Sequence, residues 1–101
     1  MPDQESFEGK LSVVDRPDDA RYELHLADEV VGLATYDRRD DVVTIPHVET
    51  APRHRGNGFA AVLMSGIVDD VRARGLKIRP LCPYAAGYMH DDASTHDLIA
   101  D

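Results

Sequence analysis

Charged and flexible residues occur together in the stretch APRHRGNGFAAVLM, residues 51–64. Arg53 and Arg55 supply two positive charges, and Gly56 and Gly58 follow directly before a long apolar run. Glycine lets a backbone turn and approach a ligand closely, because it has no Cβ atom. The start of a helix adds unpaired N–H groups and a partial positive charge, which suit a phosphate or pyrophosphate. The sequence therefore predicts an anion site at this turn.

Several interpretations of the turn differ in what it holds. The spacing Gly56-x-Gly58-x-x-Ala61 fits the dinucleotide fingerprint. That fold needs several more strand–helix units and an acidic residue for the ribose, whereas few residues remain and residues 76–82 contain no acid. A Walker loop is excluded, because no Gly-Lys-Ser/Thr follows. An ordinary strand–helix turn with solvated arginines remains an alternative.

Apolar periodicity predicts the elements that position this turn. The predicted strands before it are residues 7–14, 22–26, 30–36 and 42–50, with turns at 16–19, 28–29 and 38–41. Apolar residues at helical spacing from Ala60 to Val71 predict an amphipathic helix, which Gly75 ends. A strand Lys77–Cys82 and a short helix from Pro83 to about Met89 follow. From His90 onward the chain is polar and is expected to fray.

Composition limits the class of protein further. The 101 residues are 43% hydrophobic and 30% charged, which indicates one globular domain over the whole chain, and one cysteine excludes an internal disulfide. No apolar run could cross a membrane, so we expect a cytoplasmic protein. The net charge of −8 arises in residues 1–49, which hold 13 acidic and 5 basic residues. This charge disfavours nucleic acid and attracts cationic amines, or serves solubility alone. Histidine spacing predicts no metal site, and the oligomeric state stays open.

A second pattern in the same turn, Arg53-x-x-Gly56-x-Gly58, resembles the signature of the GNAT superfamily, the coenzyme-A-dependent N-acetyltransferases. The longer stretch RGNGFAAVLMSGIVDDVRARGLKIRPLCPYAAGYM is similar to the compact, single-domain members of that superfamily. The resemblance covers residues 42–89 well and the early strands loosely.

The resemblance implies a fold and a cofactor site. The fold is a mixed α/β sheet in the order β-β-β-β-α-β-α, whose fourth and fifth strands splay apart so that acetyl-CoA enters between them. Pro80 fits this splay, because proline cannot donate to a strand ladder. Main-chain groups from Val48 to Thr50 would face the pantetheine arm. The pyrophosphate would be wrapped by Arg53, His54, Arg55, Gly56, Asn57, Gly58, Phe59 and Ala60.

Acetyl transfer to an amine needs a base and a proton donor for the leaving thiolate. At the end of the fourth predicted strand, Glu49 could accept the amine proton, and His47 on the same face is a second candidate. Cys82, before a short helix, could act as a nucleophile or be a buried apolar residue. By the resemblance, Tyr88 would protonate the thiolate, with Tyr84 as an alternative. Each tyrosine could also serve core packing.

The sequence departs from typical GNAT enzymes on the acceptor side. The segment Arg16 to Ala20 replaces two helices that usually shape the acceptor pocket, so we expect an open, shallow surface. Such a surface fits a lysine side chain, a terminal amine or a polyamine. It fits equally a module that binds coenzyme A without turnover. A small module whose glycine turn holds no ligand is a third alternative.

Overall fold

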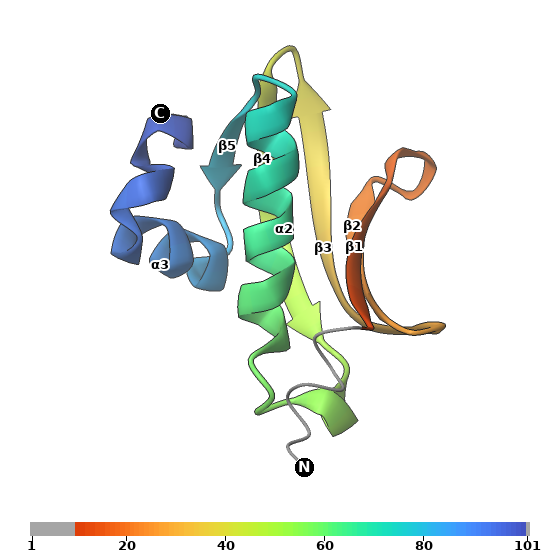
Figure 1. Ribbon diagram of the computed structural model, residues 1–101. Coiled ribbons are helices and arrows are strands. Elements are labelled where there is room, and N and C mark those ends of the chain that lie inside the picture. The colour runs from red at the N-terminus through yellow and green to blue at the C-terminus, as the bar shows by residue number, and fades with distance from the viewer. Residues whose placement is uncertain (1–9, 101) are drawn as a thin grey trace.

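The computed structural model describes residues 10–100, which form one five-stranded sheet with helices (Figure 1). The strands are β1 (Leu11–Arg16), β2 (Arg21–Leu26), β3 (Glu29–Arg39), β4 (Val42–Thr50) and β5 (Lys77–Pro80). They lie side by side in chain order. The first four are antiparallel, and β5 runs parallel to β4. This topology confirms the predicted mixed sheet.

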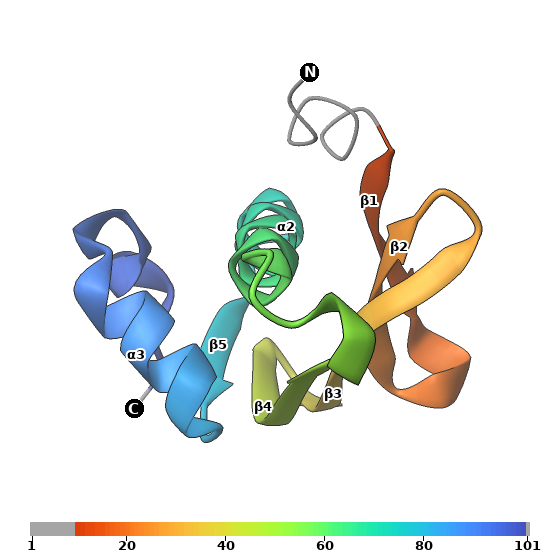
Figure 2. The ribbon, with the colours of Figure 1, turned by 90° about the horizontal axis from the view of Figure 1, so that it is seen from below.

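Within residues 10–100, two α-helices and three short 3₁₀ helices complete the fold. They are α2 (Phe59–Ala73), α3 (Pro83–Asp91), Pro17–Asp19, Pro52–His54 and Ala93–Leu98. The long helix α2 packs along one face of the sheet and contacts all five strands. The shorter α3 lies beside β5 at the edge of the sheet (Figure 2). Among residues 10–100, no long helix covers the other face of β2, β3 and β4.

The core lies between α2 and the sheet. The predicted apolar stripe of α2 is buried from Leu63 to Val71, whereas Ala60 is only half-buried and Phe59 fills the first core position instead. The stripe packs against sheet residues with no more than 1% exposure, among them Leu24, Val31, Ala34 and Ile45. Burying each large apolar side chain contributes about 1.5–3 kcal/mol. This packing explains why the single crossover helix holds the sheet in place.

The strand boundaries differ from the predicted ones where exposed charged residues predict a turn. β3 runs through Arg38 and Arg39, which pair with β4, and its turn consists of Asp40 and Asp41. Exposed charged side chains do not interrupt a backbone ladder, so this boundary was predicted too early. β5 ends at Pro80, two residues before the predicted end. Residues 7–9 of the predicted first strand lie outside the described part of the chain.

The C-terminal segment is ordered by contacts, so the predicted fraying is wrong within the described residues. The hydroxyl of Thr95, which is 1% exposed, donates to the carbonyls of Met89 and Asp92 at 2.8 Å. Leu98 joins the core, and the Ala100 N–H donates to the Ile78 carbonyl at 2.7 Å. The segment therefore covers the outer edge of β5. The order of this segment could not be predicted from apolar periodicity, because it depends on one buried hydroxyl and one apolar residue.

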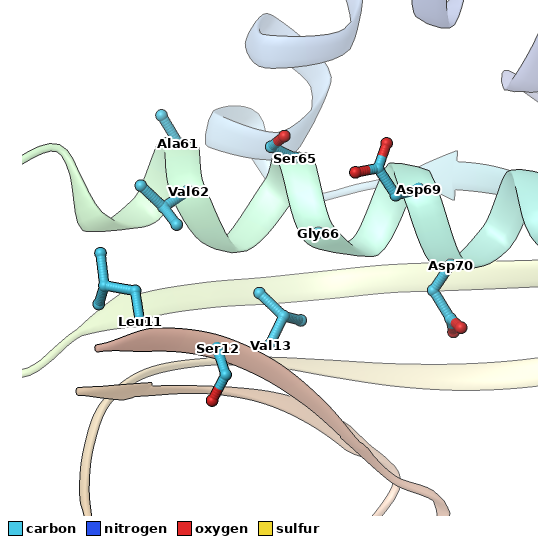
Figure 3. A pocket seen from close by; sticks show the side chains of 9 residues that line it. All are labelled: Leu11, Ser12, Val13, Ala61, Val62, Ser65, Gly66, Asp69 and Asp70. Atoms are coloured by element: carbon cyan, nitrogen blue, oxygen red, sulfur yellow. The ribbon is translucent and has the colours of Figure 1, made fainter. Parts of the chain in front are cut away.

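Gly66 of α2 faces Val13 of β1 in an open groove between the two elements (Figure 3). A Cβ atom at Gly66 would lie 2.4 Å from Cγ2 and 2.7 Å from Cβ of Val13. We expect Gly66→Ala to lower the free energy of unfolding by about 1–2 kcal/mol, because overpacking outweighs the better helix propensity of alanine. Urea denaturation measures this loss.

Gly87 of α3 provides the matched control. A Cβ atom there meets nothing within 4 Å, so Gly87→Ala should stabilise the protein by about 0.5–1 kcal/mol. Val13→Ala should rescue Gly66→Ala only in part in the double variant, because the Cγ contacts disappear but the Cβ atom of residue 13 stays 2.7 Å from the added Cβ. A stabilised Gly66→Ala protein would mean that β1 and α2 do not approach as closely as described.

Candidate functional site

A β-bulge interrupts β4 at Ile45–Pro46. Between the pairs Thr35–His47 and Asp37–Thr44, β3 advances by two residues and β4 by three. The extra residue reverses the alternation of the rest of β4. Side chains that would have pointed toward α2 therefore point to the opposite face, and backbone groups that would have bonded to β3 point toward β5.

Backbone groups of Val48 and Thr50 are directed away from β3. The Ala51 N–H donates to the Val31 carbonyl at 2.8 Å, so alternate residues back along β4 from Ala51 form the hydrogen-bonded pairs with β3. Val48 and Thr50 fall between these pairs. Their N–H and C=O groups therefore face the β5 side.

The pairing of β4 with β5 ends at Ile45, as the predicted splay requires. The Ile45 carbonyl accepts from the N–H groups of Leu81 and Cys82, both at 3.0 Å, and the chain then turns into α3. Among the described residues, no strand continues the ladder beside the second half of β4. The residues in the second half of β4 therefore have backbone donors and acceptors that no neighbouring strand uses on the β5 side.

Pro80 does not cause this separation. The Ile78 carbonyl bonds to Ala100 on the outer edge of β5, and by alternation the missing N–H of Pro80 belongs to that outer edge too. Pro80 still lies opposite Ile45 in the ladder. The explanation offered from sequence is therefore wrong, and the bulge together with the turn into α3 accounts for the separation.

The glycine turn before α2 has the geometry that its sequence predicts. Gly56 and Gly58 have φ angles of +88° and +75°, and Gly58 is the N-cap residue of α2. A Cβ atom at either position would meet nothing within 4 Å, so the space beside the turn is open. No described side chain caps the helix, and the N–H group of Ala60 in its first turn has no intrahelical acceptor. Asn57 closes the turn by donating to the His54 carbonyl at 3.2 Å.

Two of the basic residues predicted at the turn contact an acidic residue, Glu29, which the sequence pattern places only in a hairpin turn. Arg53 forms an ion pair with Glu29 at the start of β3, and His54 lies 3.1 Å from the same carboxylate. Hydrogen bonds from Arg53 and then His54 lower the pKa of Glu29. Arg55 has no acidic partner within ion-pair distance among the described residues, so it contributes the unbalanced positive charge of the turn.

Glu49 and His47 lie together on the face opposite α2. The His47 Nε2 atom is 2.7 Å from Glu49 Oε1, and both side chains are 54% exposed. Their ladder partners on β3 are Thr35 and Leu33, whereas the core residue Ala34 pairs with Val48. The shared face of His47 and Glu49, which period two predicts, is confirmed. The Glu49 carboxylate and the glycine turn both belong to the C-terminal end of β4 and the segment that directly follows it.

The predicted residues of the C-terminal half gather around α3. Cys82 lies after β5, as the N-cap residue of α3, and its thiol is buried in the core cluster. Tyr88 packs partly against the same core. Tyr84 is 42% exposed, and burial of its hydroxyl, followed by the nearby Tyr88, raises its pKa. Both tyrosines line an open hollow along α3.

A buried carboxylate on the face opposite α2 was missed from sequence. Glu23 is 4% exposed and contacts Arg21 at 2.7 Å, His25 at 2.8 Å and Arg16 at 3.4 Å. Strand alternation correctly assigns Glu23 to the face away from the core, but does not show that its neighbours cover it. These contacts, the His25 hydrogen bond first, lower the pKa of Glu23 to about 2.

This lowered pKa predicts a specific pH dependence of stability. An ionised Glu23 stabilises the fold above its unfolded pKa of about 4.5, and the contribution is lost as the pH falls through about 2. We expect Glu23→Gln to cost about 2 kcal/mol at pH 7, because two guanidinium groups lose their anionic partner. Thermal unfolding from pH 7 to pH 2 should show the two proteins converging at acid pH. A difference that stays constant below pH 4 would contradict this assignment.

One signal in the sequence could have revealed the bulge. Proline within a strand occurs at edges and bulges, and Pro46 lies in the middle of an otherwise β-branched run. No comparable signal marks Glu29, which meets Arg53 only through the fold. Among residues 10–100, no group of three or more His, Cys, Asp or Glu side chains could hold a metal ion, and no described helix is long and apolar enough to span a bilayer.

The splayed sheet, the bulge and the glycine turn describe an α/β domain whose fourth and fifth strands separate beside the N-terminus of its long helix. A family model described as GCN5-related N-acetyl-transferase matches residues 21–98. The chain therefore belongs to the GCN5-related N-acetyltransferase family. By this membership it is an acetyl-CoA-dependent N-acetyltransferase. The comparison with curated proteins found no match.

Solved structures share the fold at low sequence identity. A GCN5-like protein from Staphylococcus aureus is 19% identical, with a TM-score of 0.68 over 90% of this chain and 89% of that one. The ribosomal-protein alanine N-acetyltransferase from Escherichia coli is 11% identical, with a TM-score of 0.60 over 90% and 72% of the two chains. N-acetylglutamate synthase from Neisseria gonorrhoeae, complexed with coenzyme A and N-acetyl-glutamate, is 15% identical, with a TM-score of 0.57 over 87% and 23%.

Proposed function

We propose that the protein transfers an acetyl group from acetyl-CoA to a primary amine, with Glu49 as the base. The observation that carries this proposal is the bulge in β4. It directs the backbone of Val48 and Thr50 toward the unpaired β5 side and the Glu49 carboxylate toward the face opposite α2. A cofactor and an acceptor can therefore approach the same strand from different sides.

The residues of the glycine turn fit the pyrophosphate of coenzyme A. Among the described residues, nothing fills the space beside the two glycines, and no side chain caps the start of α2. Helix N–H groups and the charge of Arg55 would hold the phosphates, with Arg53 and His54 joining if they leave Glu29. Backbone groups of Val48 and Thr50 would bond to the pantetheine amides. Bound acetyl-CoA supplies the acetyl group as an activated thioester.

The Glu49–His47 pair supplies the base. An alkylamine is protonated at neutral pH and must lose its proton before it can attack a carbonyl carbon. Glu49 Oε2 accepts that proton directly or through water, while Oε1 is in contact with His47. The half-exposed position of both side chains allows the proton to pass on to solvent.

Proton donation to the leaving thiolate falls to Tyr88, with Tyr84 as the alternative on the same helix. Both hydroxyl-bearing side chains lie on α3, directly after the turn that ends the β4–β5 ladder. Cys82 stands at this turn, and its buried thiol supports a packing role as strongly as a nucleophilic one. Intact mass measured after rapid quench with acetyl-CoA distinguishes the two roles, since a nucleophilic Cys82 accumulates an acetyl group.

An acetyl-CoA turnover screen over small amines, polyamines and lysine peptides tests the proposal. We expect release of free thiol that depends on the amine and falls in Glu49→Gln. Coenzyme A that binds without any amine-dependent turnover would favour a regulatory binding module. A thermal shift with coenzyme A and none with NAD would separate a coenzyme A site from a dinucleotide site.

A further inference from the structure

The sheet face opposite α2 carries a charged row that runs away from Glu49. Glu23 on β2 pairs with Leu33 on β3, and Leu33 pairs with Glu49 on β4, so these three side chains share one face. We call this surface the open face, defined by Glu23, Leu33 and Glu49 together with Arg16 and Arg21. No described α-helix lies over its β2 and β3 part (Figure 2).

The β2 end of the open face is positive, although the whole chain is acidic. Glu23 is the one acidic partner, among the described residues, of both Arg16 and Arg21. Their side chains remain 49% and 38% exposed, while that of Glu23 is 5% exposed. A guanidinium has five N–H donors, and Glu23 contacts the Nε and Nη2 atoms of Arg21. The two arginines therefore keep donors directed to solvent and a net positive charge.

The spacing of this cluster from Glu49 sets a length. Neighbouring strands lie about 4.8 Å apart, so β2 and β4 are separated by about 10 Å. Half-buried Leu33 lies between them and offers an apolar surface. Because Glu23 fixes both guanidinium groups in place, they can bind an anion with little loss of side-chain freedom.

We propose that the open face selects an acceptor that carries a carboxylate about 10 Å from its reacting amine, joined by an apolar spacer. The amine lies at Glu49, the spacer crosses Leu33, and the carboxylate bonds to Arg16 and Arg21. This inference rests on the proposed acetyl transfer at Glu49. It disfavours polyamines, whose second cation would meet the two arginines.

A series of ω-amino acids and their amides tests this acceptor class. We expect 8-aminooctanoate to have a kcat/KM about tenfold above that of 8-aminooctanamide, because only the acid forms a charge-assisted pair with the arginines. The difference should lie in KM. The shorter 4-aminobutanoate cannot span two strand spacings, so it should show no such preference over its amide. Arg21→Gln and Arg16→Gln should each reduce the preference for 8-aminooctanoate toward one.

Arg39→Gln is the matched control, because Arg39 also pairs with a carboxylate, that of Asp37, at an exposed strand end. It should keep the preference. Equal turnover of acid and amide by the wild-type protein, or a preference that survives both arginine variants, overturns the acceptor class and leaves acetyl transfer standing. Absence of turnover with every amine, while coenzyme A still binds, overturns the proposed function itself.

Discussion

Replacing Gly58 with glutamate is expected to weaken coenzyme A binding by about 100-fold or more. The new carboxylate would project into the open space beside the first turn of α2, where the pyrophosphate is proposed to bind. Two like charges 4 Å apart repel by about 4 kcal/mol near a protein surface. Isothermal titration with coenzyme A measures the loss, and a thermal shift at saturating ligand provides a second readout.

Gly75 offers a control with the same chemistry at the other end of the helix. Its φ angle is +71°, close to the +75° of Gly58, and a Cβ atom there also meets nothing within 4 Å. Gly75→Glu therefore adds the same backbone strain and the same charge far from the turn, and should bind coenzyme A normally. Equal loss in both variants would indicate strain, and normal binding by Gly58→Glu would show that the phosphates bind elsewhere.

Glu49→Gln should lower kcat by about 100–1000-fold while the affinity for coenzyme A is retained. The amide keeps the size of the carboxylate but cannot accept a proton, and a positioned general base contributes about that factor. Initial rates of thiol release at saturating acetyl-CoA and amine measure the effect. His47→Gln should have a smaller effect, because His47 contacts the carboxylate and not the acceptor.

Asp37→Asn serves as the comparison, since it removes an exposed carboxylate from the neighbouring strand β3. Its kcat should remain within about twofold of the wild-type value, because a surface ion pair contributes little. If the Glu49→Gln variant keeps a third or more of the wild-type kcat, a group other than Glu49 acts as the base.

The local parts of the site could be predicted from the sequence, because they depend on few neighbouring residues. Glycine at 56 and 58 indicates a turn in the left-handed region, and the apolar spacing of α2 indicates which face it buries. Both features arise within a few residues of chain, so pattern and geometry agree. The order of the five strands follows from the same local signals together with short connections.

The contacts that tune the site could not be predicted, because they join residues distant in sequence. Glu29 and Arg53 are 24 residues apart and meet through the β3–β4 pairing. Strand alternation places Glu23 on the face away from the core, and only the fold reveals that Arg16 and Arg21 cover it. The ordered C-terminal segment depends on Thr95, whose single hydroxyl leaves no periodic signal.

The bulge at Ile45–Pro46 has an evolutionary consequence. Deleting one residue from this segment would restore regular alternation, which would turn Glu49 toward the apolar core and Val48 toward water. Many substitutions in β4 would leave the site in place. One deletion or insertion before Glu49 would instead exchange the two faces of the sheet to which the following β4 side chains point. Among related sequences, the spacing between Val43 and Glu49 should therefore be kept more strictly than the residues that fill it.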